Sequence, residues 1–168
     1  NEQLEKLQTD HIDFYLMHGL RASRWETVQE FDLLEQAERA KQDGRIRYLG
    51  FSFHDTFDVF KKIVDGHDWT FCQIQYNYMN EEIQAGTKGL EYAASKGLAV
   101  VIMEPLLGGK LANPPDPVQE MWDSAEQDRT AVDWALQWLW NKPEVSVVLS
   151  GMSTLQQVKE NVASADRS

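Results

Sequence analysis

The sequence has very little cysteine and no long apolar run. Its single cysteine, Cys72, lies in the apolar stretch TFCQIQ, so neither an intrachain disulfide nor a cysteine cluster for zinc or an iron–sulfur centre can form within these 168 residues. No stretch approaches the ~18 apolar residues that a membrane-spanning helix needs, and no signal-like segment opens the chain. These absences favour a reducing, cytoplasmic setting in which Cys72 is a small buried apolar residue.

Positive charge is also scarce. The chain has 16 Lys and Arg residues against 27 Asp and Glu residues, which gives a formal net charge of −11. This balance argues against nucleic acid or an anionic membrane as the main partner. Hydrophobic residues nevertheless make up 42% of the sequence, and the length suits one domain, so we expect a folded core.

What the sequence does contain is a repeated unit, in which a short apolar run ends on a polar or small residue and is followed by a loop and a helix-like segment. The first run is Asp10–Gly19, DHIDFYLMHG, which ends near residue 18, and the other four end near residues 52, 75, 103 and 150. Such alternation predicts parallel strands joined by helical crossovers. The strands can belong either to an open doubly wound sheet or to part of an eight-unit barrel, and periodicity leaves both open.

Local signals predict where the helices begin and where a long loop lies. Ser23 and Glu26 match a capping box at the start of one helix over residues 24–43, and Ser153 and Gln156 match a second box at the start of the final helix. Asp55 is placed to cap the helix between the second and third strands. The stretch 105–117 is the longest irregular segment, and we expect it to be a functional loop.

In either arrangement a ligand would bind at the carboxyl ends of the strands. An imidazole, a hydroxyl, amides and glycines on one rim suit a polar small molecule together with a phosphate-bearing cofactor. His18 can act there as a general acid or as a hydrogen-bond donor to a carbonyl oxygen, although a purely structural role is also open. The residues predicted to meet at this rim are His18, Ser52, His54, Gln73, Gln75, Glu104, Gly108, Gly109 and 150–153.

Several common ligand-binding motifs are missing from the sequence. No two of the four histidines stand four residues apart, so no helical metal site is predicted. Neither G-x-G-x-x-G nor a P-loop motif occurs, which removes most of the support for a standard Rossmann or P-loop protein. The Gly-Gly-Lys sequence at 108–110 and the start of the last helix remain as phosphate-binding candidates, with an ordinary turn and an ordinary capped helix as the alternatives.

Five segments together resemble the second half of an aldo-keto reductase, in the same order and at fitting spacings. They are DHIDFYLMH, KQDGRIRYLGFSFH, QIQYNYMN, KGLAVVIMEPLLGGKL and SVVLSGMSTLQQVKENV, and they cover nearly the whole chain. GFSFH and MEPLLGGKL are most similar to the bacterial branch that often carries a ferredoxin-like extension, which this sequence does not contain. The resemblance implies that residues 1–168 form one partial barrel domain, namely strands four to eight of a TIM-type (β/α)8 barrel without its N-terminal strands. It also implies a parent oxidoreductase that reduces aldehydes or ketones by hydride transfer from NAD(P)H.

The resemblance assigns roles to individual residues. His18 would hold the substrate carbonyl beside a catalytic tyrosine, and Ser52 and Gln73 would hold the nicotinamide carboxamide. The loop after the fourth strand would wrap the nicotinamide and pyrophosphate, and the start of the last helix would take the adenosine end. The cofactor-binding residues implied in these two segments are Met103, Glu104, Leu106, Gly108, Gly109 and Lys110, then Gly151, Met152, Ser153, Gln157, Glu160 and Asn161. No metal is expected within these residues.

Some positions depart from the family pattern. The usual Ser-Asn pair after the family's fifth strand is Ser52-Phe53 here, so we hypothesise that His54 or the backbone replaces one carboxamide contact. Met103 stands where an aromatic ring commonly stacks on the nicotinamide, and a thioether can pack there with looser geometry. Gly151 and Gln157 replace basic residues that many members use for the 2′-phosphate. The sequence therefore predicts no strong preference for NADP and allows NAD.

The family's catalytic aspartate, tyrosine and lysine lie on its first three strands, which this sequence does not include. Residues 1–10 resemble the last turns of a helix already under way, so we expect the chain to be part of a longer protein and to be inactive alone. Its expected partners are a small carbonyl substrate, the missing N-terminal half of the barrel and, through open sheet edges, another copy of itself. The alternative is a non-catalytic half-barrel that binds nucleotide or assembles with itself.

Overall fold

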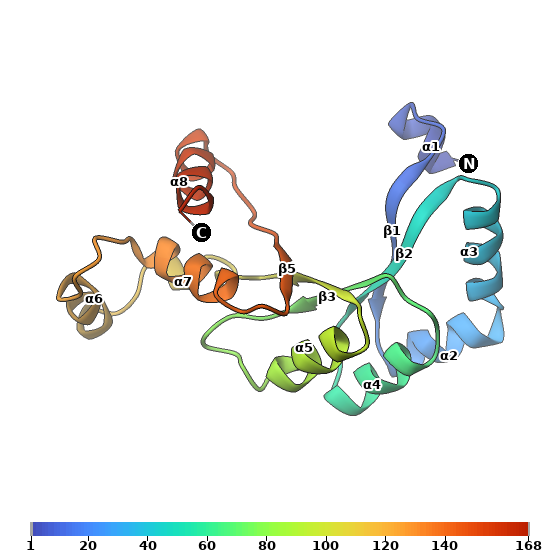
Figure 1. Ribbon diagram of the computed structural model, residues 1–168, viewed down its shortest axis with the longest axis horizontal. Coiled ribbons are helices and arrows are strands. Elements are labelled where there is room, and N and C mark those ends of the chain that lie inside the picture. The colour runs from blue at the N-terminus through green and yellow to red at the C-terminus, as the bar shows by residue number, and fades with distance from the viewer. Residues whose placement is uncertain (1, 168) are drawn as a thin grey trace.

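The computed structural model describes residues 2–167, which form one parallel sheet with helical crossovers (Figure 1). Its strands are β1 Ile12–Leu20, β2 Ile46–Phe53, β3 Phe71–Gln75, β4 Ala99–Met103 and β5 Val145–Val148. They pair in the order β1-β2-β3-β4-β5, and every neighbouring pair is parallel. The predicted strands are therefore confirmed. A doubly wound sheet reverses its strand order at a switch point, whereas this sheet keeps the chain order, as a barrel wall does.

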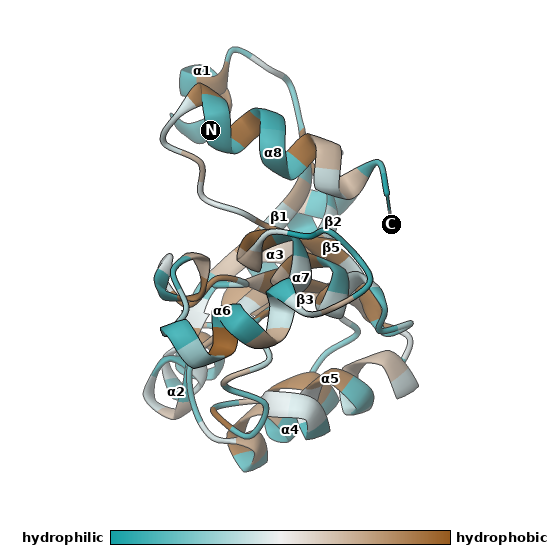
Figure 2. Cartoon of the chain, turned by 90° about the vertical axis from the view of Figure 1, so that its left-hand side faces the viewer, coloured by the Kyte–Doolittle hydropathy of each residue, from teal (hydrophilic) through white to brown (hydrophobic). Residues whose placement is uncertain are grey.

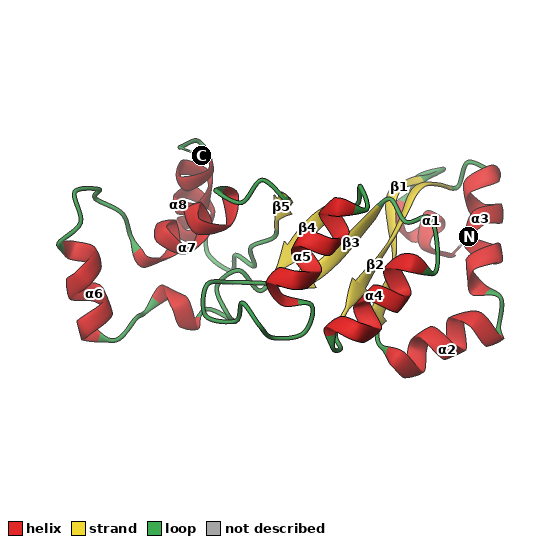
Figure 3. Cartoon of the chain, turned by 60° about the horizontal axis from the view of Figure 1, so that its bottom comes forward, coloured by secondary structure: helices red, strands yellow, loops and turns green. Residues whose placement is uncertain are grey.

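A helical segment follows each strand, as the sequence predicts, and one further helix, over residues 116–123, lies where the sequence predicts none. The helices are α1 Glu2–Leu7, α2 Ala22–Glu30, α3 Leu33–Gln42, α4 Phe57–Asp65, α5 Gly86–Ser95, the 3-10 turn η1 Lys110–Ala112, α6 Asp116–Asp123, α7 Ala131–Trp140 and α8 Leu155–Ala165. Figure 3 shows α4 and α5 lying across one face of the strands, while α6 stands apart from the sheet. The predicted loop after β4 is irregular except for η1 and the start of α6, which begins at Asp116.

The prediction of one helix over residues 24–43 is wrong in its extent and in its cap. The chain forms two helices there, because Asp32 adopts a left-handed conformation with φ 50° between α2 and α3. The helix α2 starts at Ala22, so Ser23 lies inside its first turn and makes no cap. The cap comes from the next βα loop instead, where a carboxylate oxygen of Asp55 accepts the Ala22 N–H at 2.9 Å. Asp55 does not serve as the N-cap of α4, which is Thr56.

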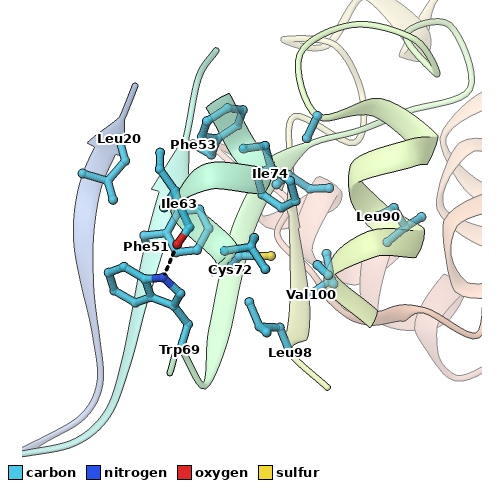
Figure 4. Packing of buried hydrophobic residues seen from close by; sticks show 14 of the residues in the cluster. Leu20, Phe51, Phe53, Ile63, Trp69, Cys72, Ile74, Leu90, Leu98 and Val100 are labelled. Atoms are coloured by element: carbon cyan, nitrogen blue, oxygen red, sulfur yellow. Dashed lines mark hydrogen bonds between the residues drawn. The ribbon is translucent and has the colours of Figure 1, made fainter. Parts of the chain in front are cut away.

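The core lies between one face of the sheet and the helices that cross it (Figure 4). Alternate residues of β2, β3 and β4 point into it and have no solvent exposure: Leu49, Phe51, Phe53, Cys72, Ile74, Val100 and Ile102. Phe60 and Ile63 of α4 and Ala93 of α5 meet them from the other side, equally buried. The Trp69 indole N–H donates to the Ile63 carbonyl at 2.8 Å, so the one polar group of that ring is satisfied. We call this side of the sheet the covered face.

The opposite side of the sheet, here called the open face, lacks such a layer within residues 2–167. Phe14, Tyr48 and Val147 on this face are 65%, 45% and 47% exposed. Phe14 stacks on Tyr48 at 5.1 Å and meets the edge of Phe71 at 5.7 Å between ring centroids. Beyond β5, Leu155, Val158 and Val162 are also exposed and form apolar bands on α8, brown in Figure 2. Apolar surface thus remains uncovered on the sheet and on the last helix.

Candidate functional site

The strand ends bring several predicted residues together on the open face. In the register of the sheet Ser52 pairs with Gln73, and Gln75 pairs with Met103. Side chains of a strand alternate between the two faces, so Ser52, Gln73 and Met103 lie on the same face at adjacent strand ends. The Gln73 side-chain amide donates to the Met103 sulfur at 3.4 Å. Three of the residues assigned to the nicotinamide end are thereby neighbours.

His18 lies two residues before the end of β1, on the same face as Phe14 by the alternation of side chains along the strand. Its backbone carbonyl accepts a hydrogen bond from the Arg24 guanidinium at 2.9 Å, which fixes the main chain at this point. The His18 residue is exposed, and its imidazole has no hydrogen-bond partner among residues 2–167. The ring is therefore free to meet a ligand at the rim.

Ser52 is only 1% exposed, and its hydroxyl oxygen accepts the Gly19 N–H at 2.7 Å. Because Ser52 accepts this bond, its hydroxyl hydrogen remains available for donation. Phe53 points to the covered face, where it packs on Phe60 at 5.0 Å, and so makes no contact on the open face. The His54 N–H donates to the Leu20 carbonyl at 3.0 Å. The sequence predicts His54 or the backbone as substitutes for the missing contact to the nicotinamide carboxamide. The backbone N–H of His54 is already used, whereas its imidazole stays free.

The loop after β4 has the backbone of an anion-binding turn. Leu107, Gly108 and Gly109 have φ values of 49°, 64° and 88°, and a Cβ added at either glycine would meet no atom within 4 Å. The carbonyl of Leu106 accepts the N–H of Gly109 at 2.9 Å, which closes the turn. The Gly108 N–H has no acceptor among the described residues. Together with the exposed Lys110, this open amide suits a phosphate group.

The start of α8 is arranged differently from the prediction. The helix begins at Leu155, so the capping box consists of Thr154 and Gln157 and not of Ser153 and Gln156. The Gln157 side-chain oxygen accepts the N–H groups of Ser153 at 2.8 Å and Thr154 at 3.1 Å. An anion approaching these two amides must displace Gln157, and Gly151 and Met152 lie exposed just before them.

Two further predicted residues of α8 are engaged with their neighbours. The Asn161 side-chain amide donates to the Ser150 hydroxyl at 2.9 Å and so ties the loop after β5 to the helix. Glu160 accepts a hydrogen bond from the Gln156 side chain at 2.7 Å. Both side chains keep further donor or acceptor capacity, because each of these bonds uses only one of their polar atoms.

Two residues at the rim were not predicted, namely Asn77 and Gln84. Asn77 comes two residues after β3 and is fully buried, and Gln84 donates to the Gln75 side-chain oxygen at 2.8 Å. The signal for Asn77 is the one that singled out His18 and Ser52: a polar residue directly after an apolar run. Its partner, described below, lies 27 residues further along the chain.

Residues 2–167 contain neither a metal-binding cluster nor a membrane-spanning helix. No group of three His, Cys, Asp or Glu side chains is placed to hold a metal ion there. No helix in the same residues combines the length and apolarity that crossing a bilayer requires. Burial raises the pKa of the Cys72 thiol to about 12, so it is protonated and unreactive at neutral pH.

The chain matches known proteins over nearly its whole length. The sequence model of the aldo/keto reductase family matches residues 1–167. L-galactose dehydrogenase of Arabidopsis thaliana is 28% identical, over 97% of this chain and 55% of that protein. The uncharacterized oxidoreductase YqkF of Bacillus subtilis is 26% identical, over 98% of this chain and 58% of that protein. The chain thus spans little more than half the length of these relatives.

Solved structures give the same relationship. Aldo-keto reductase AKR11C1 from Bacillus halodurans, in its holo form, matches with a TM-score of 0.78 at 27% identity, over 98% of this chain and 57% of that protein. An aldo-keto reductase from Klebsiella pneumoniae, solved in complex with NADPH, matches with a TM-score of 0.69 at 24% identity, over 97% of this chain and 56% of that protein. The matches confirm the predicted fold class, a parallel α/β sheet that is part of a (β/α)8 barrel.

Proposed function

Since the chain belongs to the aldo/keto reductase family, we propose that it supplies strands four to eight of an enzyme that reduces aldehydes or ketones with NAD(P)H. The parent is an oxidoreductase, as its relatives are. The observation that supports the proposal best is the row formed by Ser52, Gln73 and Met103 on adjacent strand ends. Family resemblance assigns these three residues to the nicotinamide, and the fold places them side by side on the open face.

The residues around this row have distinct roles in the proposal. NAD(P)H, when bound, supplies the hydride. The Gln73 amide and the Ser52 hydroxyl hydrogen bond the carboxamide of the nicotinamide, and Met103 packs against its ring. The free imidazole of His18 donates a hydrogen bond to the carbonyl oxygen of the substrate, which orients the carbon that receives hydride.

The rest of the cofactor would lie along the two remaining segments. The open amide of Gly108 and the positive φ values of Gly108 and Gly109, with Lys110 beside them, suit the pyrophosphate, and Glu104 and Leu106 shape that loop. The adenosine end would lie against Gly151, Met152, Ser153, Glu160 and Asn161 at the start of α8. The Gln157 side-chain oxygen already accepts hydrogen bonds from the two N–H groups there, those of Ser153 and Thr154, and this side chain carries no positive charge. We therefore propose that NADP is not strongly preferred over NAD.

The isolated chain is proposed to bind cofactor but not to turn over substrate. It contains none of the family's Asp, Tyr and Lys set from the first three strands, so no tyrosine donates a proton to the alkoxide that hydride transfer creates. The exposed Phe14, Tyr48 and Val147 of the open face favour a second function for the chain alone. That function is a nucleotide-binding half-barrel that pairs with an N-terminal half or with another copy of itself through the edge strands β1 and β5.

Titration of NADH and NADPH into the purified chain, followed by cofactor fluorescence, tests the proposal. We expect both to bind with affinities within about tenfold of each other, and Gln73→Ala to weaken both by about tenfold through loss of one hydrogen bond to a polar ligand group. The exposed Gln42→Ala is the matched control and should change nothing. NADPH bound far more tightly than NADH would contradict the predicted lack of preference, and an equal loss in both variants would contradict the role of Gln73.

The enzyme proposal for the parent has a separate test. The coding sequence upstream of Asn1 should encode the Asp, Tyr and Lys set of the family's first three strands. The 168-residue chain itself should show no reduction of a generic aldehyde by NADPH. Turnover by the chain alone, or an upstream sequence without a tyrosine-bearing first half, would overturn the proposal.

A further inference from the structure

The turn that leaves β4 is held in an unfavourable backbone conformation. Glu104 follows β4 directly and has φ 54°, in the left-handed region that residues other than glycine seldom adopt. Such a conformation persists only where surrounding contacts hold it. Glu104 is also the first residue of the loop that carries the proposed pyrophosphate contacts at Gly108 and Gly109.

The contact that holds this turn comes from Asn77. The Asn77 side-chain N–H donates to the Glu104 carbonyl at 3.0 Å, and its side-chain oxygen accepts the Met79 N–H at 3.2 Å. Both ends of the amide are therefore used, and Asn77 has no solvent exposure. The main chain adds a second tie, because the Tyr76 N–H donates to the Met103 carbonyl at 3.2 Å. The loop after β3 thus clamps the end of β4 by two hydrogen bonds.

Hydrogen bonds within the loop after β4 connect the residues that follow Glu104 to this clamp. The Glu104 carbonyl, besides accepting from Asn77, accepts the Leu107 N–H at 3.1 Å, and the Leu107 carbonyl accepts the Lys110 N–H at 3.3 Å. Asn77 is the side chain that ties this series to the rest of the fold at its first carbonyl. Loss of that tie would release the turn at Glu104 and, with it, the amide of Gly108.

We propose that Asn77 is a positioning residue for the dinucleotide: it holds the loop 104–110 in the shape that presents the free Gly108 amide to the pyrophosphate, without touching the cofactor itself. The inference rests on the proposed function, because that function places the pyrophosphate at this loop. The inference adds Asn77 to the residues of the proposed cofactor site, as a residue that acts on the cofactor through the backbone of Glu104. It also separates the two ends of the cofactor, since none of the hydrogen bonds of Asn77 within residues 2–167 reaches α8, where the adenosine end is proposed to lie.

The test compares Asn77→Asp with a destabilised control. The aspartate keeps the size of the side chain and the acceptor for Met79 but removes the donor to Glu104. Ile63→Val trims the buried core at α4, away from the loop, and provides a variant of lowered stability with an intact clamp. Both variants are measured in the 168-residue chain for binding of NADPH and of adenosine 5′-monophosphate. The second probe reports on the adenosine end alone.

We expect Asn77→Asp to weaken NADPH binding about 5- to 10-fold, the loss expected of one hydrogen bond, and to leave the affinity for adenosine 5′-monophosphate unchanged. Amide hydrogen exchange should accelerate at Leu107, Gly109 and Lys110 and not in α5. Ile63→Val should change neither the loop exchange nor the nucleotide affinity. Equal weakening of both nucleotides, or unchanged exchange in the loop, would overturn the inference.

Failure of the inference and failure of the proposed function give different results. If the unchanged chain binds no NADPH, the proposed cofactor role fails, and the exchange comparison alone decides whether Asn77 holds the loop. If Asn77→Asp does not fold, nucleotide binding and hydrogen exchange are measured on Asn77→Ala instead. This variant also lacks the donor to Glu104 but places no carboxylate beside the Glu104 carbonyl. Normal NADPH affinity in either folded variant would show that the loop keeps its shape without the clamp.

Discussion

The two faces of the sheet carry the same strands but experience different surroundings. On the covered face, Phe51, Cys72 and Ile74 have no solvent exposure and lie against α4 and α5. On the open face, Phe14 and Tyr48 remain roughly half exposed or more, and His18 and Gln73 each lie two residues before the end of their strand. One face therefore supplies the free energy that folds the chain, while the other supplies the polar rim on which the proposed function depends. Substitutions on the two faces should separate these contributions.

The largest effect is expected on the covered face, at Phe60 of α4. Its ring is fully buried and contacts Phe51 at 5.8 Å and Phe53 at 5.0 Å between centroids. Phe60→Ala removes this ring from the centre of the core and should lower the free energy of unfolding by about 3–5 kcal/mol. Urea denaturation followed by tryptophan fluorescence measures the change. A loss below about 1 kcal/mol would mean that the covered face is not the main source of stability.

The second prediction concerns the reactivity of Cys72 on the same face. Burial raises its pKa from 9.0 to about 12, so the thiolate fraction at pH 8 falls by about 1,000-fold relative to the unfolded chain. Alkylation of the folded chain by iodoacetamide at pH 8 should therefore be slower by at least that factor than alkylation in urea. Rapid labelling of the native chain would show that the covered face opens readily, and that the two faces differ less than their burial implies.

The covered face is also what the sequence predicts best. The apolar run of β4 is nearly unbroken, as is typical of buried parallel strands, and in β3 the apolar residues of the covered face alternate with Gln73 and Gln75. The observed strand ends lie within two residues of the predicted ones. Prediction succeeds here because the signal for a strand lies within the strand itself.

The sequence predicts less well those features whose partners lie far along the chain. The cap of α2 comes from Asp55, 33 residues beyond Ala22, so the local Ser-x-x-Glu pattern was misleading. At α8 the adjacent Ser153 and Thr154 both fit a capping box, and pattern alone cannot choose between them. The clamp between Asn77 and Glu104 spans 27 residues and has no local signature. Most residues of the rim were predictable, whereas Asn77, Gln84 and the contacts that hold the rim were not.

A smaller effect is expected on the open face, at Phe14. Its ring is 65% exposed and touches Tyr48 and Phe71, so Phe14→Ala loses mainly two aromatic contacts and should cost about 1 kcal/mol or less in the isolated chain. The same urea denaturation as for Phe60→Ala makes the two faces directly comparable. A loss as large as that of Phe60→Ala would indicate that something covers the open face in solution. Analytical ultracentrifugation would then identify a second copy of the chain as the cover.

The smallest effect concerns Asp55, at the rim where the two faces meet. Hydrogen bonds from the Ala22 and Thr56 N–H groups lower the pKa of its carboxyl below the ordinary value of 3.8. The charged form is thus favoured in the folded state, and the stability this provides is present above the unfolded pKa and is lost as the pH falls through the folded pKa. Asp55→Asn should lower the melting temperature by a few degrees at pH 7 and by less at pH 3, so its deficit shrinks on acidification. Asp58→Asn removes the same charge near the start of α4, where Asp58 has no hydrogen bond among the described side chains, and is the charge-matched control. A pH-independent deficit for Asp55→Asn would mean that the cap of α2 does not depend on the ionised carboxylate.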